Sequence, residues 1–219
     1  NQHHFMIDLC NPYITEDMIS EVVDTLHSRW IGQGPKVDRF EREFAKKFEQ
    51  RYCVSLNSGS AALETAYELV GIQKGDEVIT TPLTCTATNI PLLRMGAKIV
   101  WGDINEDTLC LSKASVLDKV TERTKAIVNV HLGGVDNDFG EMPLPVVSDA
   151  CQALGVFSGD YTCNSFQAIK HITTGDGGML TVPTYTDYRT AKLKRWFGID
   201  RERKEAEGWQ SLKERKMTF

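Results

Sequence analysis

The chain has 219 residues and a formal net charge of −5, from 25 lysines and arginines against 30 aspartates and glutamates. With 41% hydrophobic and 25% charged residues, it has the composition of a globular protein with a sizeable core, which excludes disorder throughout. The mildly acidic balance argues against a nucleic-acid partner, and no apolar run is long enough to predict a membrane span.

Two helices are expected at the start of the chain. Thr15 suits the cap of the first, whose apolar residues recur at helical spacing from Met18 to Trp30. Pro35 suits the first position of the second, after the glycines at 32 and 34. Its apolar stripe ends at Phe48 and is expected to pack into the core.

Short apolar strands then alternate with helices. Buried strands are expected at Tyr52–Leu56, Glu77–Thr81, Lys98–Trp101, Ala126–Val130 and Leu144–Val147. Helices are expected at Ala61–Val70, Thr86–Met95, Leu111–Val120 and Thr186–Phe197. This alternation predicts an α/β fold of three layers, α/β/α, in which helices cover both faces of a mostly parallel sheet.

The six cysteines are scattered, without a C-x-x-C pair or a histidine at metal-ligand spacing. We therefore expect neither a metal site nor a disulfide framework, but small buried side chains in a reducing compartment. Because the first residues also show no secretory signal pattern, the sequence favours a cytoplasmic location.

The first segment that could carry chemistry is Asn57-Ser58-Gly59-Ser60, between an expected strand and an expected helix. Backbone N–H groups at a helix start favour an anion, and Gly59 permits a close approach, so this turn suits a phosphate group. A plain capped turn is the alternative and, for this segment alone, the better supported one.

The second segment is centred on Asp149, which follows the expected strand ending at Val147. Open α/β sheets place ligands at the carboxyl ends of their strands, where this carboxylate could hold a cation or a protonated ring nitrogen. An aspartate that only caps the following turn is an equally good interpretation.

The third segment holds Lys170, between Ile169 and Ile172 and before the glycine-rich run 175–178. An amine kept away from water is a nucleophile towards aldehydes, and the glycines would let the backbone bend closely around a bound group. A lone lysine is usually a solvated surface charge, but these neighbours argue against that. Together, an anion cradle, a carboxylate and an amine are the groups that hold pyridoxal 5′-phosphate (PLP).

In their order along the chain, these motifs resemble those of the DegT/DnrJ/EryC1/StrS sugar aminotransferases, a family of fold type I (aspartate aminotransferase-like) PLP enzymes. The matching blocks are Trp30–Pro35, Phe40-Glu41, Asn57–Leu63, Gly75–Ile79, Asp149–Gly155, Ser165-Phe166, Lys170 and Ile172–Met179. The resemblance implies a PLP-binding large domain over residues 1–199. It also implies that the charged segment 200–219 is a connection towards a C-terminal small domain beyond this chain, and that the full-length protein is a homodimer.

The resemblance also implies roles for single residues. Lys170 would form a Schiff base with PLP and then move the proton between substrate and cofactor. Asp149 would pair with the pyridinium nitrogen, and Gln152 would lie against the phenolic oxygen of the ring. His131 and His171 receive no catalytic role, and we interpret both as structural.

The phosphate of PLP would be held by Ser60, the backbone of Ala61 and Ser165, beside Gly59. In this family an aromatic side chain commonly stacks on the PLP ring at the position that is Cys85 here. Cysteine offers a weaker contact, so this sequence departs from the family pattern there.

The implied reaction transfers an amino group from an amino acid, glutamate in the family, to a nucleotide-linked keto-deoxy sugar. Such a reaction would serve amino-sugar and surface polysaccharide biosynthesis. One alternative is a non-catalytic half-enzyme that acts as a binding or regulatory partner. Another is a PLP-dependent sugar dehydratase, but that branch of the family has histidine in place of the lysine, and Lys170 argues against it.

Overall fold

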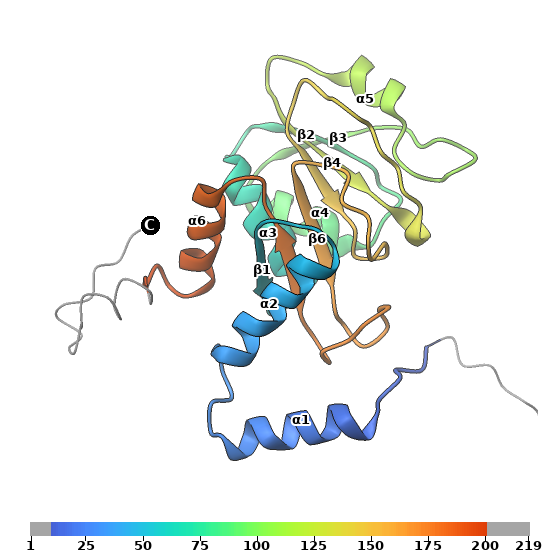
Figure 1. Cartoon of the computed structure of the whole chain (residues 1–219). Helices are drawn as coiled ribbons and strands as arrows, with labels where there is room; N and C mark the ends of the chain where they lie inside the picture. Colours follow the sequence, from blue (N-terminus) through green and yellow to red (C-terminus); the bar gives the residue numbers. More distant parts are fainter. Residues whose placement is uncertain (1–9, 201–219) are drawn as a thin grey trace, which may run out of the picture.

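A seven-stranded sheet organises the part of the chain that the computed structural model describes, residues 10–200 (Figure 1). The strands are β1 (Cys53–Leu56), β2 (Glu77–Thr80), β3 (Lys98–Trp101), β4 (Thr124–Val130), β5 (Val146–Asp149), β6 (Tyr161–Ser165) and β7 (Gly178–Thr181). Their order across the sheet is β1-β7-β6-β5-β4-β2-β3. The expected connection over residues 200–219 lies, apart from Asp200, outside the described residues.

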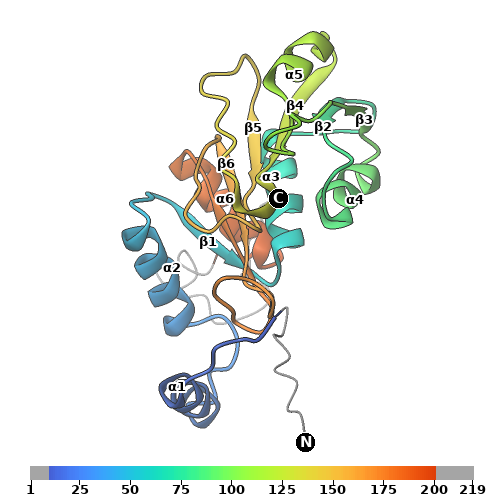
Figure 2. The same cartoon turned by 90° about the vertical axis from the view of Figure 1, so that its right-hand side faces the viewer.

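Helices cover both faces of this sheet, which confirms the expected three-layer α/β fold (Figures 1 and 2). They are α1 (Glu16–His27), α2 (Pro35–Lys47), α3 (Gly59–Val70), α4 (Thr86–Arg94), α5 (Lys113–Lys119) and α6 (Tyr185–Arg195). α3, α4 and α6 share a core on one face of the sheet, whereas α2 and α5 pack on the other. None of the described helices is both long and apolar enough to cross a membrane.

The sheet is mostly parallel, as expected, but two of its strands were not predicted. β2 to β6 pair in parallel, whereas β7 runs antiparallel to both of its neighbours, β1 and β6. Polar Thr162 and Asn164 interrupt the apolar pattern of β6, and β7 begins at a glycine, so neither segment has a clear strand signal. Because β7 lies between β1 and β6, it fixes the distance between the turns that follow those strands.

The core follows the period-2 alternation of side chains along buried strands. In β2, Val78 packs into the core on the α3 side of the sheet, while Ile79 packs with Val116 of α5 on the other side. Strand β3 does not match the expectation of burial, because it is an edge strand and Trp101 at its end is 48% exposed.

The first helix forms as expected but packs differently from the second. The Thr15 hydroxyl accepts a hydrogen bond from the Met18 amide, so Thr15 is the predicted cap. No residue of α1 is buried, and its apolar residues from Met18 to Leu26 are exposed, so within residues 10–200 no element covers them. In α2, by contrast, Phe44 is buried in a core of phenylalanine side chains.

The cysteines are all unpaired, but they are less uniformly buried than expected. Cys53, Cys110 and Cys163 lie in the interior, whereas Cys10 and Cys85 are exposed and Cys151 is half-buried. Cys85 is exposed because it caps the first turn of α4 at the sheet edge, and Cys10 because it lies in the segment before α1.

Glu77, at the start of β2, gives the fold a predicted dependence on pH. Hydrogen bonds from the Thr121 hydroxyl (2.7 Å) and then Lys98 (2.9 Å) and Arg123 (2.8 Å) lower the pKa of Glu77 from 4.5 to about 2. A carboxylate with a lowered pKa stabilises the fold above its unfolded-state pKa, and this contribution is lost on acidification.

We therefore expect Glu77→Gln to reduce the free energy of unfolding at pH 5 and above. The difference from wild type should shrink as the pH falls from about 4.5 to about 2. Urea denaturation at a series of pH values measures it, with the exposed neighbour Glu122→Gln as the control. A difference that is constant over this range would contradict the assignment.

Candidate active site

The three segments that could carry chemistry meet at the edge of the sheet where its parallel strands end. Ser58 follows β1, Asp149 ends β5 and Ser165 ends β6. Lys170 lies in the connection from β6 to β7, which leaves from this edge and returns to it at Gly178. Ligands of open α/β sheets bind at this edge, so the topology supports a site here.

Gly59 is the point at which the start of α3 meets the turn after β5 and the end of β6. A β-carbon placed on Gly59 would lie 2.8 Å from Cβ of Ser165 and 2.9 Å from the sulfur of Cys151. Both distances are too short for a real β-carbon, so only glycine fits at this position. The first turn of α3, the turn after β5 and the end of β6 are therefore in direct contact.

The glycine-rich run after Lys170 makes a second close contact, but not the expected one. A β-carbon on Gly178 would lie 2.3 Å from the carbonyl oxygen of Ser58 and 2.8 Å from the amide nitrogen of Gly59. Gly178 thus lets β7 approach the backbone at the start of α3. The prediction was that these glycines would bend around a bound group.

We expect Gly178→Ala to separate β7 from the start of α3 and to lower the free energy of unfolding by about 1–3 kcal/mol, the range typical of overpacking. Thermal or urea denaturation measures the loss. Gly32→Ala is the matched control, because its β-carbon would meet no atom within 4 Å. Equal stabilities of the two variants would show that the contact at Gly178 relaxes without cost.

The turn before α3 is a capped helix start. The Ser58 hydroxyl accepts a hydrogen bond from the Ala61 amide at 3.1 Å, so this turn carries a helix cap, whether or not it also binds an anion. The first N–H groups of a helix, here Gly59 and Ser60, have no partner within the helix. With the exposed Ser60 and the half-buried Ser165 beside them, they form a donor set that suits an anion. The Ala61 amide, by contrast, is already engaged by Ser58.

Asp149 is buried, with 6% of its surface exposed. Its Oδ1 accepts a hydrogen bond from the Cys151 amide at 3.1 Å, which caps the turn after β5. Its Oδ2 accepts a bond from the Thr88 hydroxyl at 2.6 Å. Sequence reasoning missed Thr88, which lies in α4, 61 positions before Asp149. The one local signal for it is its position in the first turn of α4, just after Thr84 and Cys85.

Lys170 lies near the turn after β5 and is half-buried. Burial, and then the charge of Asp149, raise the pKa of the Cys151 thiol well above its ordinary value, while the nearby Lys170 acts in the opposite direction. The expectation that Ile169 and Ile172 shield the Lys170 amine from water was wrong, because these two side chains are themselves 63% and 42% exposed. Both side chains belong to a loop, and no other described element covers them.

Two further predicted residues lie at the same edge. The side-chain oxygen Oε1 of Gln152 accepts a hydrogen bond from the Gly133 amide at 2.9 Å. The side-chain NH₂ group of Gln152 is then left as a donor. Cys85 caps α4 without a side-chain hydrogen bond, and its side chain is exposed, as a group that contacts a bound molecule would be.

The two histidines differ in their surroundings. His131 is fully buried; its Nδ1 accepts a hydrogen bond from the Asn137 amide at 3.2 Å, and burial lowers its pKa. The structural interpretation of His131 agrees with this burial. His171 is exposed, and it borders a small hollow together with Cys151 and Ser165.

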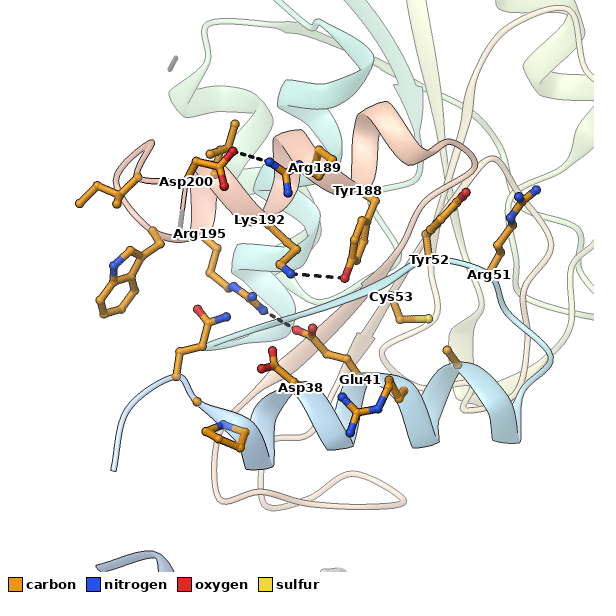
Figure 3. Close-up of a pocket in the computed structure, with 18 of the residues that line it drawn as sticks. Asp38, Glu41, Arg51, Tyr52, Cys53, Tyr188, Arg189, Lys192, Arg195 and Asp200 are labelled. Carbon is orange, nitrogen blue, oxygen red and sulfur yellow. Dashed lines mark hydrogen bonds and ion pairs between the residues drawn. The ribbon is translucent and has the colours of Figure 1, made fainter. Parts of the chain in front are cut away.

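A separate cavity of about 670 Å³ lies between α2, β1 and α6 (Figure 3). Arg195 and Glu41 form a buried ion pair there, and Glu41 Oε1 also accepts bonds from the amide and hydroxyl of Ser55. This explains the Phe40-Glu41 block as a structural feature that joins the three elements. None of the predicted site residues lines this cavity.

Comparison with known proteins agrees with this geometry. The model of the DegT/DnrJ/EryC1/StrS aminotransferase family matches residues 12–217. The spore coat polysaccharide biosynthesis protein SpsC of Bacillus subtilis is 41% identical over 185 residues, covering 78% of this chain and 48% of SpsC. The UDP-4-amino-4-deoxy-L-arabinose–oxoglutarate aminotransferase of Shewanella sediminis is 36% identical over 220 residues, covering 92% and 56%. The chain thus spans about half the length of the curated relatives it matches.

Solved structures show the same fold. The PMP form of Spr1654 from Streptococcus pneumoniae has a TM-score of 0.87 at 29% identity, covering 98% of this chain and 62% of that one. A PLP form of the same protein matches with a TM-score of 0.86. The GDP-4-keto-6-deoxymannose-3-dehydratase ColD also matches, with a TM-score of 0.82 at 25% identity, covering 89% and 56%.

Proposed function

Because the chain belongs to the DegT/DnrJ/EryC1/StrS aminotransferase family, we propose that it is the PLP-binding part of a sugar aminotransferase. The enzyme transfers an amino group from glutamate to a nucleotide-linked keto-deoxy sugar, in the biosynthesis of amino sugars for surface polysaccharides. The observation that carries the proposal is the contact at Gly59 of the start of α3, the turn after β5 and the end of β6, which brings the anion cradle next to the turn that follows the buried Asp149. Lys170 lies close enough to that turn for its charge to act on the Cys151 thiol.

The residues at this edge fit PLP. The first N–H groups of α3, at Gly59 and Ser60, and the hydroxyls of Ser60 and Ser165 suit its phosphate, and the absence of a β-carbon at Gly59 lets Ser165 lie beside them. The Ala61 amide already donates to the Ser58 hydroxyl, so a bond from it to the phosphate would be a second, shared one. Cys85 replaces the aromatic residue of the family, so the contact with the ring is weaker there.

When bound, PLP acts as an electron sink for the carbanion that amino-group transfer requires. Lys170 supplies the amine that holds the cofactor and then carries the proton at Nζ. Thr88 and the Cys151 amide hold the two oxygens of Asp149, whose carboxylate would pair with the protonated ring nitrogen. Gln152 offers its NH₂ group to the phenolic oxygen of the ring.

The substrates are proposed from the relatives. SpsC is named for spore coat polysaccharide biosynthesis, and the Shewanella protein for a UDP-linked amino sugar and oxoglutarate. Oxoglutarate is what glutamate becomes when it gives up its amino group, which supports glutamate as the donor here. The scattered, unpaired cysteines support a cytoplasmic location, and the family resemblance supports a homodimer for the full-length protein.

Two other functions remain as outcomes of the test. The match to ColD keeps a sugar dehydratase in view. Lys170 argues against it, because the family resemblance implies histidine at this position in the dehydratase branch. A protein that binds the cofactor or a partner but does not catalyse is the other.

The experiment adds PLP to the purified chain and records the visible absorbance. It then adds glutamate, followed by a panel of nucleotide-linked 4-keto-6-deoxy sugars, with mass spectrometry of the products. The proposal expects a visible band, bleaching by glutamate and an aminated sugar. The absence of a band would overturn PLP binding, whereas a band without an aminated sugar would favour the half-enzyme, and a deoxygenated sugar the dehydratase.

A further inference from the structure

The buried contact between Thr88 and Asp149 is not needed to cap a turn or to fill the core. The Thr88 side chain is fully buried, and its hydroxyl donates to Asp149 Oδ2 at 2.6 Å. A threonine inside a helix often bonds the carbonyl four positions earlier instead. Here the hydroxyl bonds a carboxylate on a different element, and short bonds to carboxylates are among the strongest in proteins.

The direction of the bonds follows from proton counting. A threonine hydroxyl has one proton, and Thr88 gives it to Asp149, which can only accept. The Thr84 hydroxyl, 2.8 Å from that of Thr88, must therefore be the donor of that pair. The result is a directed chain from Thr84 to Thr88 to Asp149.

The backbone of Thr88 is anchored as well. The Tyr67 hydroxyl, from the buried face of α3, donates to the Thr88 carbonyl oxygen at 2.9 Å. Since α3 also carries the proposed phosphate cradle at Gly59 and Ser60, this bond joins the cradle helix to the residue that holds Asp149. Together with the contact of Gly59 with Cys151, this connection through Tyr67 and Thr88 fixes the distance from the phosphate cradle to the carboxylate.

Few of the groups around Asp149 provide compensating charge. Burial, and then Asp149, raise the pKa of Tyr67 and of Cys163 well above their ordinary values, and the same causes act on Cys151. Burial lowers the pKa of His131. These groups therefore stay uncharged near neutral pH, which makes the donated bond from Thr88 important for the carboxylate.

We propose that Thr88 is the positioning residue of this site: its hydroxyl, oriented by Thr84 and anchored by Tyr67, holds the Asp149 carboxylate in place for the ring nitrogen of PLP. Each carboxylate oxygen can accept about two hydrogen bonds. After the bonds from Thr88 and the Cys151 amide, both oxygens keep acceptor capacity. The inference rests on the proposed function for the identity of the ligand, but the orientation of Asp149 is a property of the chain alone.

The test compares Thr88→Val, which removes the hydroxyl, with Thr88→Ser, which keeps it. Thr80→Val is the matched control, because Thr80 is also fully buried but its hydroxyl has no hydrogen-bond partner among residues 10–200. We expect Thr88→Val to raise the dissociation constant for PLP, measured by absorbance titration, about tenfold. Thr88→Ser and Thr80→Val should stay within about twofold of wild type.

A second readout needs no PLP. The Cys151 amide donates to Asp149, so a carboxylate released by Thr88→Val should leave this amide less protected. Hydrogen exchange of the Cys151 amide in the free protein should become at least about tenfold faster in Thr88→Val and not in Thr88→Ser. Unchanged exchange and unchanged PLP affinity in Thr88→Val would overturn the inference, as would equal losses in the valine and serine variants. If wild type binds no PLP, the proposed function fails, while the exchange data still decide the role of Thr88.

Discussion

We expect Lys170→Ala to abolish the visible band that PLP produces with the chain and to lower the rate of amino transfer by about 10⁴-fold, the upper range for loss of one acid–base group. The reason is that one side chain both holds the cofactor covalently and carries the proton. No other lysine occurs between Lys125 and Lys192 in the sequence, so no neighbour in this segment can take over. Absorbance titration and a stopped assay of the aminated sugar measure the two effects separately.

His171→Ala is the control for this prediction. His171 is adjacent in the sequence and exposed, and it borders the small hollow next to Ser165 and Cys151. We expect it to retain the visible band and most of the activity. If His171→Ala loses activity and Lys170→Ala keeps it, the acid–base group has been misassigned and the dehydratase alternative gains support.

The capped start of α3 and the position of Asp149 could be predicted because both depend on short-range patterns. Ser58 lies directly before an amphipathic helix, and Asp149 follows an apolar strand. Local capping and strand periodicity determine such features, so a single sequence reveals them. The family resemblance then added the roles, which the residues alone left open.

The arrangement of the site could not be predicted in the same way. Its segments meet because β7 lies between β1 and β6, and β7 has no strand signal beyond a few apolar residues. The close contact of Gly178 with Ser58 depends on this pairing. Likewise, the neighbours of Lys170 in the sequence did not determine its burial, because which side of a loop is covered depends on distant elements.

The partners of Asp149 illustrate the same limit. Thr88 is an ordinary threonine in the first turn of α4, and nothing local distinguishes it from Thr86 two positions earlier. Its contact with Asp149 arises because α4 follows β2, which is separated from β5 only by β4, and the two carboxyl ends face the same side. Contacts between elements of this kind require the tertiary structure.

Asp149→Asn separates the two roles that the sequence left equally supported. Asparagine caps turns as well as aspartate, and its carbonyl oxygen can still accept from the Cys151 amide. A residue that only caps would therefore tolerate the change. Loss of the carboxylate, however, removes the fixed negative charge that favours a protonated ring nitrogen.

We thus expect Asp149→Asn to keep the visible band of bound PLP and to lower the free energy of unfolding by about 1.5–3 kcal/mol, the cost of losing a hydrogen bond to a charged group, here the one from Thr88. The rate of amino transfer should fall about 10²–10³-fold, as for other preorganised electrostatic groups. Asp160→Asn is the matched control, because Asp160 also accepts a backbone bond, from the Val146 amide at 2.8 Å, but at the opposite end of β5. If Asp149→Asn turned over at the wild-type rate, Asp149 would act only as a turn cap and not as the partner of the ring nitrogen. Equal loss in both variants would mean that the effect is structural, since a carboxylate at the far end of the strand cannot reach the ring.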